Sequence, residues 1–332
     1  MIGSARLAAT DVPVSSLSFG AAPIAGFSTP VGEEQAYEAI TAAWNAGIRT
    51  FDTAPHYGLG LSERRLGEVL RERPRHGFTL STKVGRLLEP YDGGGDDLAA
   101  GGFAVPATHR RVWDFSADGV RRSIEGSLER LGLDRVDIVY LHDPDDHEEW
   151  AFREGYPALE RLRAEGVVGA IGAGMNQAEM LTRFLTDTDT DVVLAAGRYT
   201  LLDQIALKAL LPAAQARGRS VVAAAVYNSG ILADPHPGAT YNYTTAPDDL
   251  VTRALRIKEL AERHGTTLRA AALAFPLAHP AVASVLVGMR SAAQVRDSVA
   301  QFTAPVPPDF WAELKAVGLL AAEAPVPESA GG

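Results

Sequence analysis

The chain has 332 residues, of which 46% are hydrophobic and 22% are charged, with a formal net charge of −10 and no cysteine. Phosphate affinity needs clustered Lys and Arg, so this acidic balance argues against a nucleic-acid-binding protein. The lack of cysteine excludes disulfides, thiolate metal sites and a cysteine nucleophile. No stretch is apolar for long enough to span a bilayer, and residues 1–11 lack a signal-peptide core. We therefore expect a cytoplasmic protein that does not enter a membrane.

Hydrophobic periodicity predicts that strands and helices alternate along the whole chain. Strands are expected at residues 12–20, 48–52, 78–83, 136–141, 167–173, 192–196, 220–226 and 284–287. Helices are expected at residues 33–46, 63–70, 117–131, 158–164, 178–185, 206–216, 250–263, 268–277 and 292–302. Two segments without periodicity, 84–116 and 227–247, are predicted to be long irregular loops after the third and seventh strands.

Alternation of this kind indicates an α/β fold with a parallel sheet covered by helices. About eight strand–helix units favour a closed (β/α)8 TIM barrel, which begins with an N-terminal strand segment, over an open doubly wound sheet. No G-x-G-x-x-G motif follows the first strand, which also argues against the open sheet. We expect one domain over residues 1–322 and a disordered tail over residues 323–332, which are rich in Pro, Gly and Ser.

Polar side chains follow three of the predicted strands, where a barrel gathers its chemistry. Asp52, Lys83 and His142 stand at these strand ends, and Tyr57 lies in the loop after Asp52. An ammonium beside a phenol lowers the phenol pKa, so we expect Lys83 to bring the Tyr57 pKa below its ordinary value of about 10. Asp52 would balance the lysine, and His142 would orient a carbonyl or hydroxyl oxygen. Such a set transfers protons only, so a carbonyl–alcohol reaction also needs a hydride carrier. For the segment 51–58 taken alone, the alternative is that Asp52 caps the helix after the loop and Tyr57 is a half-buried loop aromatic.

Motifs spread over almost the whole chain resemble the aldo-keto reductase family. The matching segments are residues 51–58, 81–84, 140–143, 169–174, 229–232 and 287–291. The resemblance implies an eight-stranded barrel, a nicotinamide cofactor (NADP or NAD, without metal or flavin) bound across the barrel mouth, and Tyr57 as general acid–base. The catalytic set that it implies is Asp52, Tyr57, Lys83 and His142.

A narrower resemblance links the chain to the aldose 1-dehydrogenase branch of that family. The segments that carry it are residues 113–116, 127–135, 196–202 and 228–230. This branch includes enzymes similar to L-fucose (D-threo-aldose) dehydrogenase, L-galactose dehydrogenase and pyridoxal 4-dehydrogenase. It implies oxidation of a sugar hemiacetal, or of an aromatic aldehyde hemiacetal, to a lactone.

The resemblance also implies a cofactor site that departs from the usual family pattern. Asn176 is expected to hold the carboxamide, Tyr227 to compensate for the missing nicotinamide-stacking tyrosine, and Ser298 stands where an adenine-reading asparagine is common. Arg290 would suit the 2′-phosphate of NADP, the alternative being a solvated surface arginine. The remaining cofactor contacts are expected from Asn228, Ser229, Gly230, Leu232, Gly288, Met289 and Gln294.

Two residues are candidates for contact with a small carbonyl or sugar substrate. His56 precedes Tyr57, and Trp113 lies in the first long loop; the alternatives are a surface role for His56 and a loop anchor for Trp113. The run 143–147 contains three aspartates and a histidine, but consecutive residues cannot all face one ion, so we expect a solvated acidic loop and no metal site.

These observations favour a nicotinamide-dependent oxidoreductase acting on an aldose, such as an L-fucose- or D-arabinose-like sugar, or on a similar hemiacetal. One alternative is a general aldehyde and ketone reductase of the same fold. A second, from a different class, is a cofactor-sensing regulatory subunit without turnover, which resembles the barrel subunits of potassium channels. The sequence predicts neither the direction of the reaction nor the oligomeric state.

Overall fold

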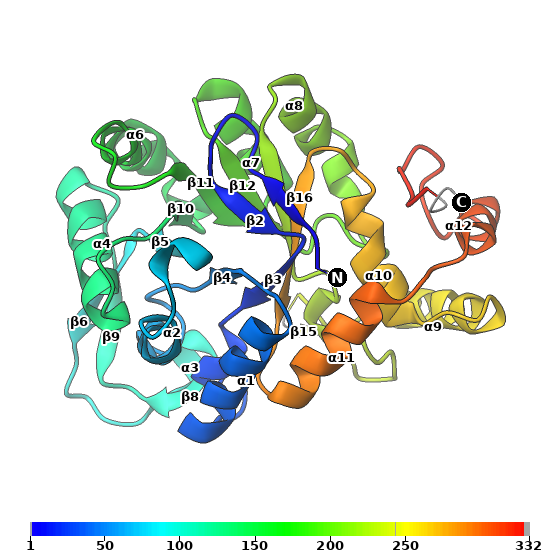
Figure 1. The fold of residues 1–332 in the computed structure, drawn as a ribbon, viewed down its shortest axis with the longest axis horizontal. Coiled ribbons are helices and arrows are strands. Elements are labelled where there is room, and N and C mark those ends of the chain that lie inside the picture. Colours follow the sequence, from blue (N-terminus) through cyan, green and yellow to red (C-terminus); the bar gives the residue numbers. More distant parts are fainter. Residues whose placement is uncertain (1, 243, 329–332) are drawn as a thin grey trace.

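The computed structural model, which describes residues 2–242 and 244–328, contains a closed barrel of eight parallel strands (Figure 1). Around the ring the strands follow the order β10-β11-β12-β13-β16-β3-β4-β5. They are β3 (Leu17–Gly20), β4 (Thr50–Asp52), β5 (Thr79–Val84), β10 (Ile138–His142), β11 (Ala170–Met175), β12 (Val192–Ala196), β13 (Ser220–Ala224) and β16 (Val282–Gly288). The ring closes where β16 pairs with β3, so the predicted (β/α)8 barrel is confirmed.

Helices surround this barrel (Figure 1). They are α1 (Glu33–Asn45), α2 (Leu61–Leu70), α4 (Ala117–Leu131), α6 (Tyr156–Ala164), α7 (Ala178–Asp187), α8 (Leu210–Ala216), α9 (Asp248–Arg263), α10 (Leu268–Leu277), α11 (Ala292–Thr303) and α12 (Pro308–Ala316). Helix α12, which begins with a proline at its first turn, was not predicted, and the expected helix 206–216 is a short 3-10 turn (Ile205–Leu207) followed by α8. Each helix of the described residues is too short or too polar to cross a membrane.

The two-residue period of the strands divides the core into two layers. On β10, Ile138 and Tyr140 belong to the cluster that fills the barrel, whereas Val139 and Leu141 pack in the layer beneath the helices. The same alternation directs the next residue, His142, toward the interior at the carboxyl end of the strand. Lys83 is paired in register with Tyr140 and therefore lies on the same inner face.

The predicted first strand, 12–20, is divided at Ser16. Strand β2 (Pro13–Ser15) pairs antiparallel with β1 (Ser4–Arg6), and the chain then bends into β3. The Ser15 hydroxyl makes the bend, since it donates to the carbonyl of Leu17 and accepts from the amide of Thr50 at 3.1 Å. The hairpin lies across the barrel (dark blue in Figure 1), and Leu7, Val12 and Val14 pack against the interior cluster.

The first predicted loop is in fact an ordered antiparallel unit, which we call the β6–β9 excursion (residues 85–116). In it β6 (Arg86–Pro90) pairs with β9 (His109–Trp113), and β7 (Asp96–Asp97) pairs with β8 (Phe103–Pro106) around the short helix α3 (Leu98–Gly101). Strands β6 and β9 are partly exposed, and the buried alternation of β8 extends over only Phe103 and Val105, so the segment is too short in apolar pattern for detection from sequence. In the described part of the second predicted loop, 227–242 and 244–247, the regular elements are a 3-10 turn (Asn228–Gly230) and the two short strands β14 (Thr240–Tyr241) and β15 (Thr244–Thr245).

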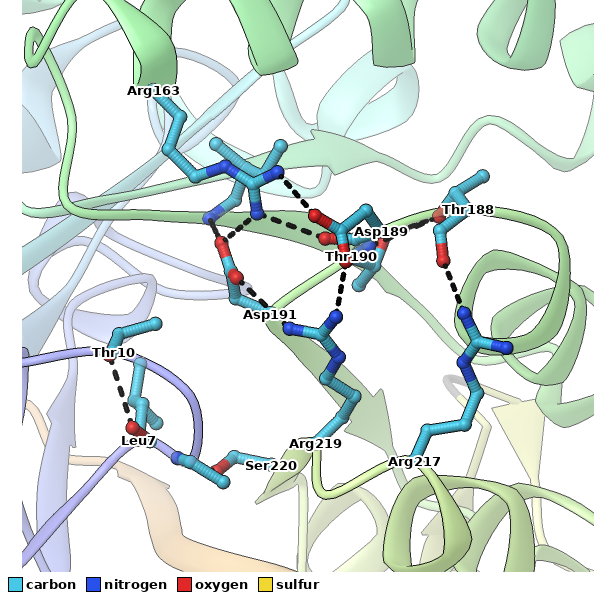
Figure 2. Close-up of polar contacts among 12 residues, drawn as sticks. Leu7, Thr10, Arg163, Thr188, Asp189, Thr190, Asp191, Arg217, Arg219 and Ser220 are labelled. Atoms are coloured by element: carbon cyan, nitrogen blue, oxygen red, sulfur yellow. Dashed lines mark hydrogen bonds and ion pairs between the residues drawn. The ribbon is translucent and has the colours of Figure 1, made fainter.

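An ion-pair network joins the elements at the amino ends of β12 and β13 (Figure 2). The Asp191 side chain, only 4% exposed, pairs with Arg163 of α6 at 2.7 Å and with Arg219 at 3.4 Å. It also accepts from the amide of Ile171 on the neighbouring strand at 3.0 Å. Asp189 pairs with the same two arginines. This end of a barrel contributes stability while the opposite end carries chemistry.

The end of the described chain packs on the barrel. Of the tail expected from residue 323 onward, residues 329–332 lie outside the described residues. Ala324 is fully buried, and Val326 packs against the core beneath the helices. The described part of this segment is therefore held by apolar contacts.

Candidate active site

Four predicted residues come together at the carboxyl ends of β4, β5 and β10. The ammonium of Lys83 donates to Asp52 Oδ2 at 2.6 Å, to the Tyr57 hydroxyl at 2.9 Å and to the Thr53 carbonyl at 3.0 Å. Asp52 accepts a further hydrogen bond from Ser81 at 2.7 Å. The Lys83 side chain is only 2% exposed, so water cannot solvate its charge. The three contacts use all three donors of the ammonium and satisfy it completely.

The charges of this group leave a neutral phenol beside a charged lysine. Burial alone would lower the pKa of Lys83, but Asp52 and Tyr57 outweigh burial and raise that pKa. Burial raises the pKa of Tyr57 to about 12, although the charge and hydrogen bond of Lys83 pull it down. The expected pKa below 10 is therefore wrong, because the loss of water around the buried phenol outweighs the effect of the lysine.

Two histidines adjoin the phenol. The His142 ring lies 5.8 Å from the Tyr57 ring and 5.6 Å from the His56 ring, measured between centroids. Burial lowers the pKa of His142 well below its usual range, and Arg86 and Lys83 lower it further. Burial, together with Arg86, Arg111 and Lys83, lowers the pKa of His56 to about 2. Both rings are therefore neutral hydrogen-bonding groups in the physiological pH range.

The β6–β9 excursion supplies side chains to this site that the sequence reading did not identify. Phe103 packs against the rings of His56 and Tyr57 at centroid distances of 5.5 and 6.0 Å. Arg86 pairs with Asp143 next to His142, and Arg111 contacts His56. Nothing in the local sequence predicts these contacts, because they depend on antiparallel pairing within a segment that has no periodicity.

Trp113 lies at the edge of this site and is more exposed than the residues around it. Its ring lies under the Arg86 guanidinium at 4.4 Å, stacks on Phe115 and touches the ring of His147 at 4.8 Å. It therefore anchors Arg86, as the alternative of a loop anchor predicts. Within the described residues, no three His, Asp or Glu side chains are grouped to hold a metal ion.

The residues expected to hold the cofactor lie in two segments at the ends of β13 and β16. After β13, Asn228, Ser229 and Gly230 have positive φ values of 46°, 59° and 103°. Asn228 is buried, and its side-chain Nδ2 donates to the carbonyl of Gly197 at 3.2 Å. Its side-chain oxygen is buried without a partner, so this strained turn presents an acceptor that lacks a donor within the described structure. Leu232, which follows the turn, is fully buried.

The second segment runs from the end of β16 into α11. Gly288 is exposed, Met289 is buried, and Ser291 caps α11 by accepting from the amide of Gln294. The Gln294 side chain in turn accepts from the amide of Arg290 at 2.9 Å. Helix N-termini favour anions because their amides point outward.

Arg290 itself donates to the Thr29 hydroxyl. It forms no ion pair with a carboxylate of the described residues. An arginine that keeps its charge unpaired beside a helix N-terminus is suited to a phosphate group. Together with the unpartnered Asn228 oxygen, this donor and acceptor set fits a dinucleotide.

Three cofactor candidates lie apart from these two segments or are buried within them. The Asn176 carbonyl, directly after β11, accepts from the side chain of Arg198 at 2.7 Å. Ser298 is buried on α11. Tyr227 packs against the core beneath the helices, and its hydroxyl has no hydrogen-bond partner within the described residues. Burial raises the pKa of this hydroxyl, with smaller effects from Asp297 and Arg269. No contact of the described residues joins Tyr227 to the Lys83–Tyr57 pair.

The fold and this group of residues define a family. The model of the aldo/keto reductase family matches residues 16–318. The chain belongs to the aldo-keto reductase family, and it is an oxidoreductase that depends on a nicotinamide cofactor.

Individual relatives agree with this assignment. The chain is 44% identical over 324 residues to D-threo-aldose 1-dehydrogenase from a Pseudomonas species, covering 94% of this chain and 97% of the relative. It is 40% identical over 332 residues to pyridoxal 4-dehydrogenase from Microbacterium luteolum, covering 95% and 97%. The holo form of the aldo-keto reductase AKR11C1 from Bacillus halodurans superimposes with a TM-score of 0.77 at 26% identity, covering 99% of each chain.

Proposed function

We propose that this protein is an aldose 1-dehydrogenase, which oxidises the hemiacetal carbon of a neutral sugar to a lactone with a nicotinamide cofactor. The relative named D-threo-aldose 1-dehydrogenase, similar over almost the whole chain, supports an L-fucose- or D-arabinose-like substrate. The pairing of charges at the site supports a neutral substrate.

Every cation that acts on the central histidine has its own carboxylate. Besides burial, the permanent charges that lower the pKa of His142 are those of Arg86, Lys83 and Arg111; His56 also lowers it but is itself neutral at physiological pH. These cations pair with Asp143, Asp52 and Asp97 at 2.5, 2.6 and 2.6 Å. A substrate carboxylate or phosphate would have to compete with these pairs, and breaking a buried one, such as Lys83–Asp52, is costly. A neutral polyol instead needs hydrogen-bond donors and acceptors, which the histidines and the phenol provide.

In this proposal the four residues move and hold one proton. Tyr57 takes the proton of the sugar hydroxyl during oxidation and returns it during reduction. Lys83 stabilises the phenolate so formed, and Asp52 keeps the lysine in place. His142, being neutral, orients the reacting oxygen through a hydrogen bond, and His56 and Trp113 line the substrate pocket. The nicotinamide, when bound, provides the acceptor or donor of hydride.

The cofactor would be held by the segments after β13 and β16. Residues 228–232 would bind one part of the dinucleotide, and residues 288–290 with Gln294 would bind another. Asn176 would hydrogen-bond the nicotinamide carboxamide. Ser298 lines this site, and Tyr227 is the remaining contact. The unpaired charge of Arg290 supports NADP over NAD, since only NADP carries the 2′-phosphate.

A substrate panel tests the proposal. Reduced nicotinamide absorbance is followed in both directions with L-fucose, D-arabinose, pyridoxal and simple aldehydes, each with NAD and NADP. We expect the aldoses to be oxidised with the highest kcat/KM and the Tyr57→Phe variant to lose about 10²–10⁴-fold in turnover. Preference for pyridoxal would reassign the substrate, and turnover of simple aldehydes alone would indicate a general reductase. Cofactor binding without turnover of any substrate would indicate a regulatory subunit and reject the proposal.

A further inference from the structure

His56 is held from behind by an arginine of the β6–β9 excursion. Arg111, on β9, reaches across to the loop after β4, where its Nε donates to His56 Nδ1 and its Nη2 donates to the His56 carbonyl at 2.9 Å. Its two terminal nitrogens also donate to the two carboxylate oxygens of Asp97, each at 2.6 Å. The Asp97 side chain is only 3% exposed. Arg111 is therefore fixed at both ends of its guanidinium.

This contact determines where the histidine carries its proton. A guanidinium donates hydrogen bonds and accepts none. His56 Nδ1 must therefore be the unprotonated nitrogen, and a neutral ring then carries its hydrogen on Nε2. The groups around the ring reinforce neutrality, since Arg86 on β6, Lys83 on β5 and Arg111 itself all oppose a second proton.

The other ring nitrogen, Nε2, is available to a ligand. Within the described residues, His56 Nε2 has no hydrogen-bond partner. The rings of His56, Tyr57 and His142 form a nearly equilateral triangle, with centroid distances of 6.0, 5.8 and 5.6 Å. If Tyr57 and His142 share the reacting oxygen, the third corner faces the carbon next to the reacting one.

We propose that Arg111, held by Asp97, is a positioning residue that fixes His56 as a neutral Nε2–H donor to the hydroxyl oxygen on the carbon adjacent to the reacting carbon. This inference rests on the proposed function for the identity of the substrate. It makes the excursion a determinant of specificity, because a sugar with that hydroxyl gains a hydrogen bond that a 2-deoxy sugar lacks. A donor that is fixed before binding costs less entropy to engage.

The kinetic test compares an aldose with its 2-deoxy analogue. Arg111→Lys keeps a positive charge for Asp97 but cannot hold the carboxylate and His56 Nδ1 in one planar fork. We expect the wild-type preference for the aldose, expressed as the ratio of kcat/KM values, to fall about tenfold, mainly through the KM of the aldose. The control is Arg110→Lys, because Arg110 is the next residue on β9 and pairs with the exposed Glu89. An equal loss on both sugars, or an unchanged ratio in a folded variant, would overturn the proposal.

A spectroscopic test needs no turnover, and its wild-type arm needs no variant of Arg111. Long-range proton–nitrogen spectra of the 15N-histidine enzyme report the protonated nitrogen of each of its eight histidines, and His56→Gln identifies the His56 signals. We expect the Nε2–H form from pH 8 down to pH 5 in the wild type and a mixture of forms in Arg111→Lys. An Nδ1–H form or a charged ring in the wild type at pH 7 would overturn the proposal. If no aldose is oxidised by the wild type, the proposed function fails, and the positioning of His56 is decided by this spectrum.

Discussion

Removing the charge of Lys83 tests how the lysine acts on the phenol. In Lys83→Met the side chain keeps a similar length but loses its three hydrogen bonds and its charge. Tyr57 then remains buried beside Asp52 with no cation between them. Without the cation the phenolate is disfavoured, because burial and a neighbouring negative charge each raise a phenol pKa.

The magnitude follows from the distance between the two groups. At the 2.9 Å that separates Lys83 Nζ from the Tyr57 hydroxyl, unit charges in an effective dielectric of about 20 interact by about 6 kcal/mol, or about 4 pKa units. The Tyr57 pKa is already about 12 in the intact site. Oxidation needs the phenolate, so we expect the variant to lose about 10²–10⁴-fold in rate at pH 8.

The assay is the pH profile of kcat/KM for oxidation, followed by the absorbance of reduced nicotinamide. In the wild type this value should rise with pH, because the base form of Tyr57 becomes more populated. In Lys83→Met the rising limb should move upward by at least one pH unit. A primary isotope effect with substrate deuterated at the reacting carbon first shows that hydride transfer limits the rate, since product release can hide the chemical step.

Two controls separate electrostatics from misfolding. Lys208→Met removes a lysine on the exposed surface and should leave the profile unchanged. Asp52→Asn combined with Lys83→Met removes both charges, and the loss should be smaller than the sum of the two single losses, because the residues act as one unit. The reasoning is refuted if the isotope effect is visible and the limb of Lys83→Met stays where it is in the wild type.

Four further outcomes are expected. Tyr57→Phe should lose about 10²–10⁴-fold in turnover while cofactor affinity, measured by fluorescence titration, stays near that of the wild type. Arg290→Ala should weaken NADP by about 1.5–3 kcal/mol more than NAD in the same titration; equal losses would indicate general disruption. The folded pKa of His56, about 2, lies below the ordinary 6.5, so its contribution to stability is complete above pH 6.5 and is lost as pH falls. At pH 5 the loss is about 2 kcal/mol, and denaturant unfolding of His56→Gln should lack this part of the acid sensitivity. Asp191→Ala should destabilise the protein by about 3 kcal/mol, because its two arginines lose a buried partner, and should leave KM unchanged.

The barrel and its four central residues were predictable because they depend on local patterns. A period of two along 136–141 separates residues that face the interior from residues that face the helices, and it can be read without knowledge of any other strand. His142 follows that strand, and Asp52 and Lys83 stand at the ends of two others. Parallel strands present their carboxyl ends at one rim, so the alternation of elements already implied that these side chains meet.

The electrostatic state of the site was not predictable in the same way. The sequence places Lys83 near Tyr57, and the lysine does pull the phenol pKa down. The net direction is upward because the ring is buried by neighbours that include Phe103, a residue from a different part of the chain. Desolvation is a sum over everything that surrounds a group, and it is known only when the surroundings are known.

The β6–β9 excursion is the part that only the tertiary structure determined. Arg111 contacts a residue 55 positions away, and Arg86 is paired in register with Trp113. These strands are short, and β6 and β9 are partly exposed, so no run is long enough for a period of the sequence to mark them. They contact the loop after β4 through His56 and the residue after β10 through Asp143, both of which are distant in sequence. The family and the grouping of the four central residues therefore follow from local sequence, whereas the surroundings of the candidate site follow from long-range packing.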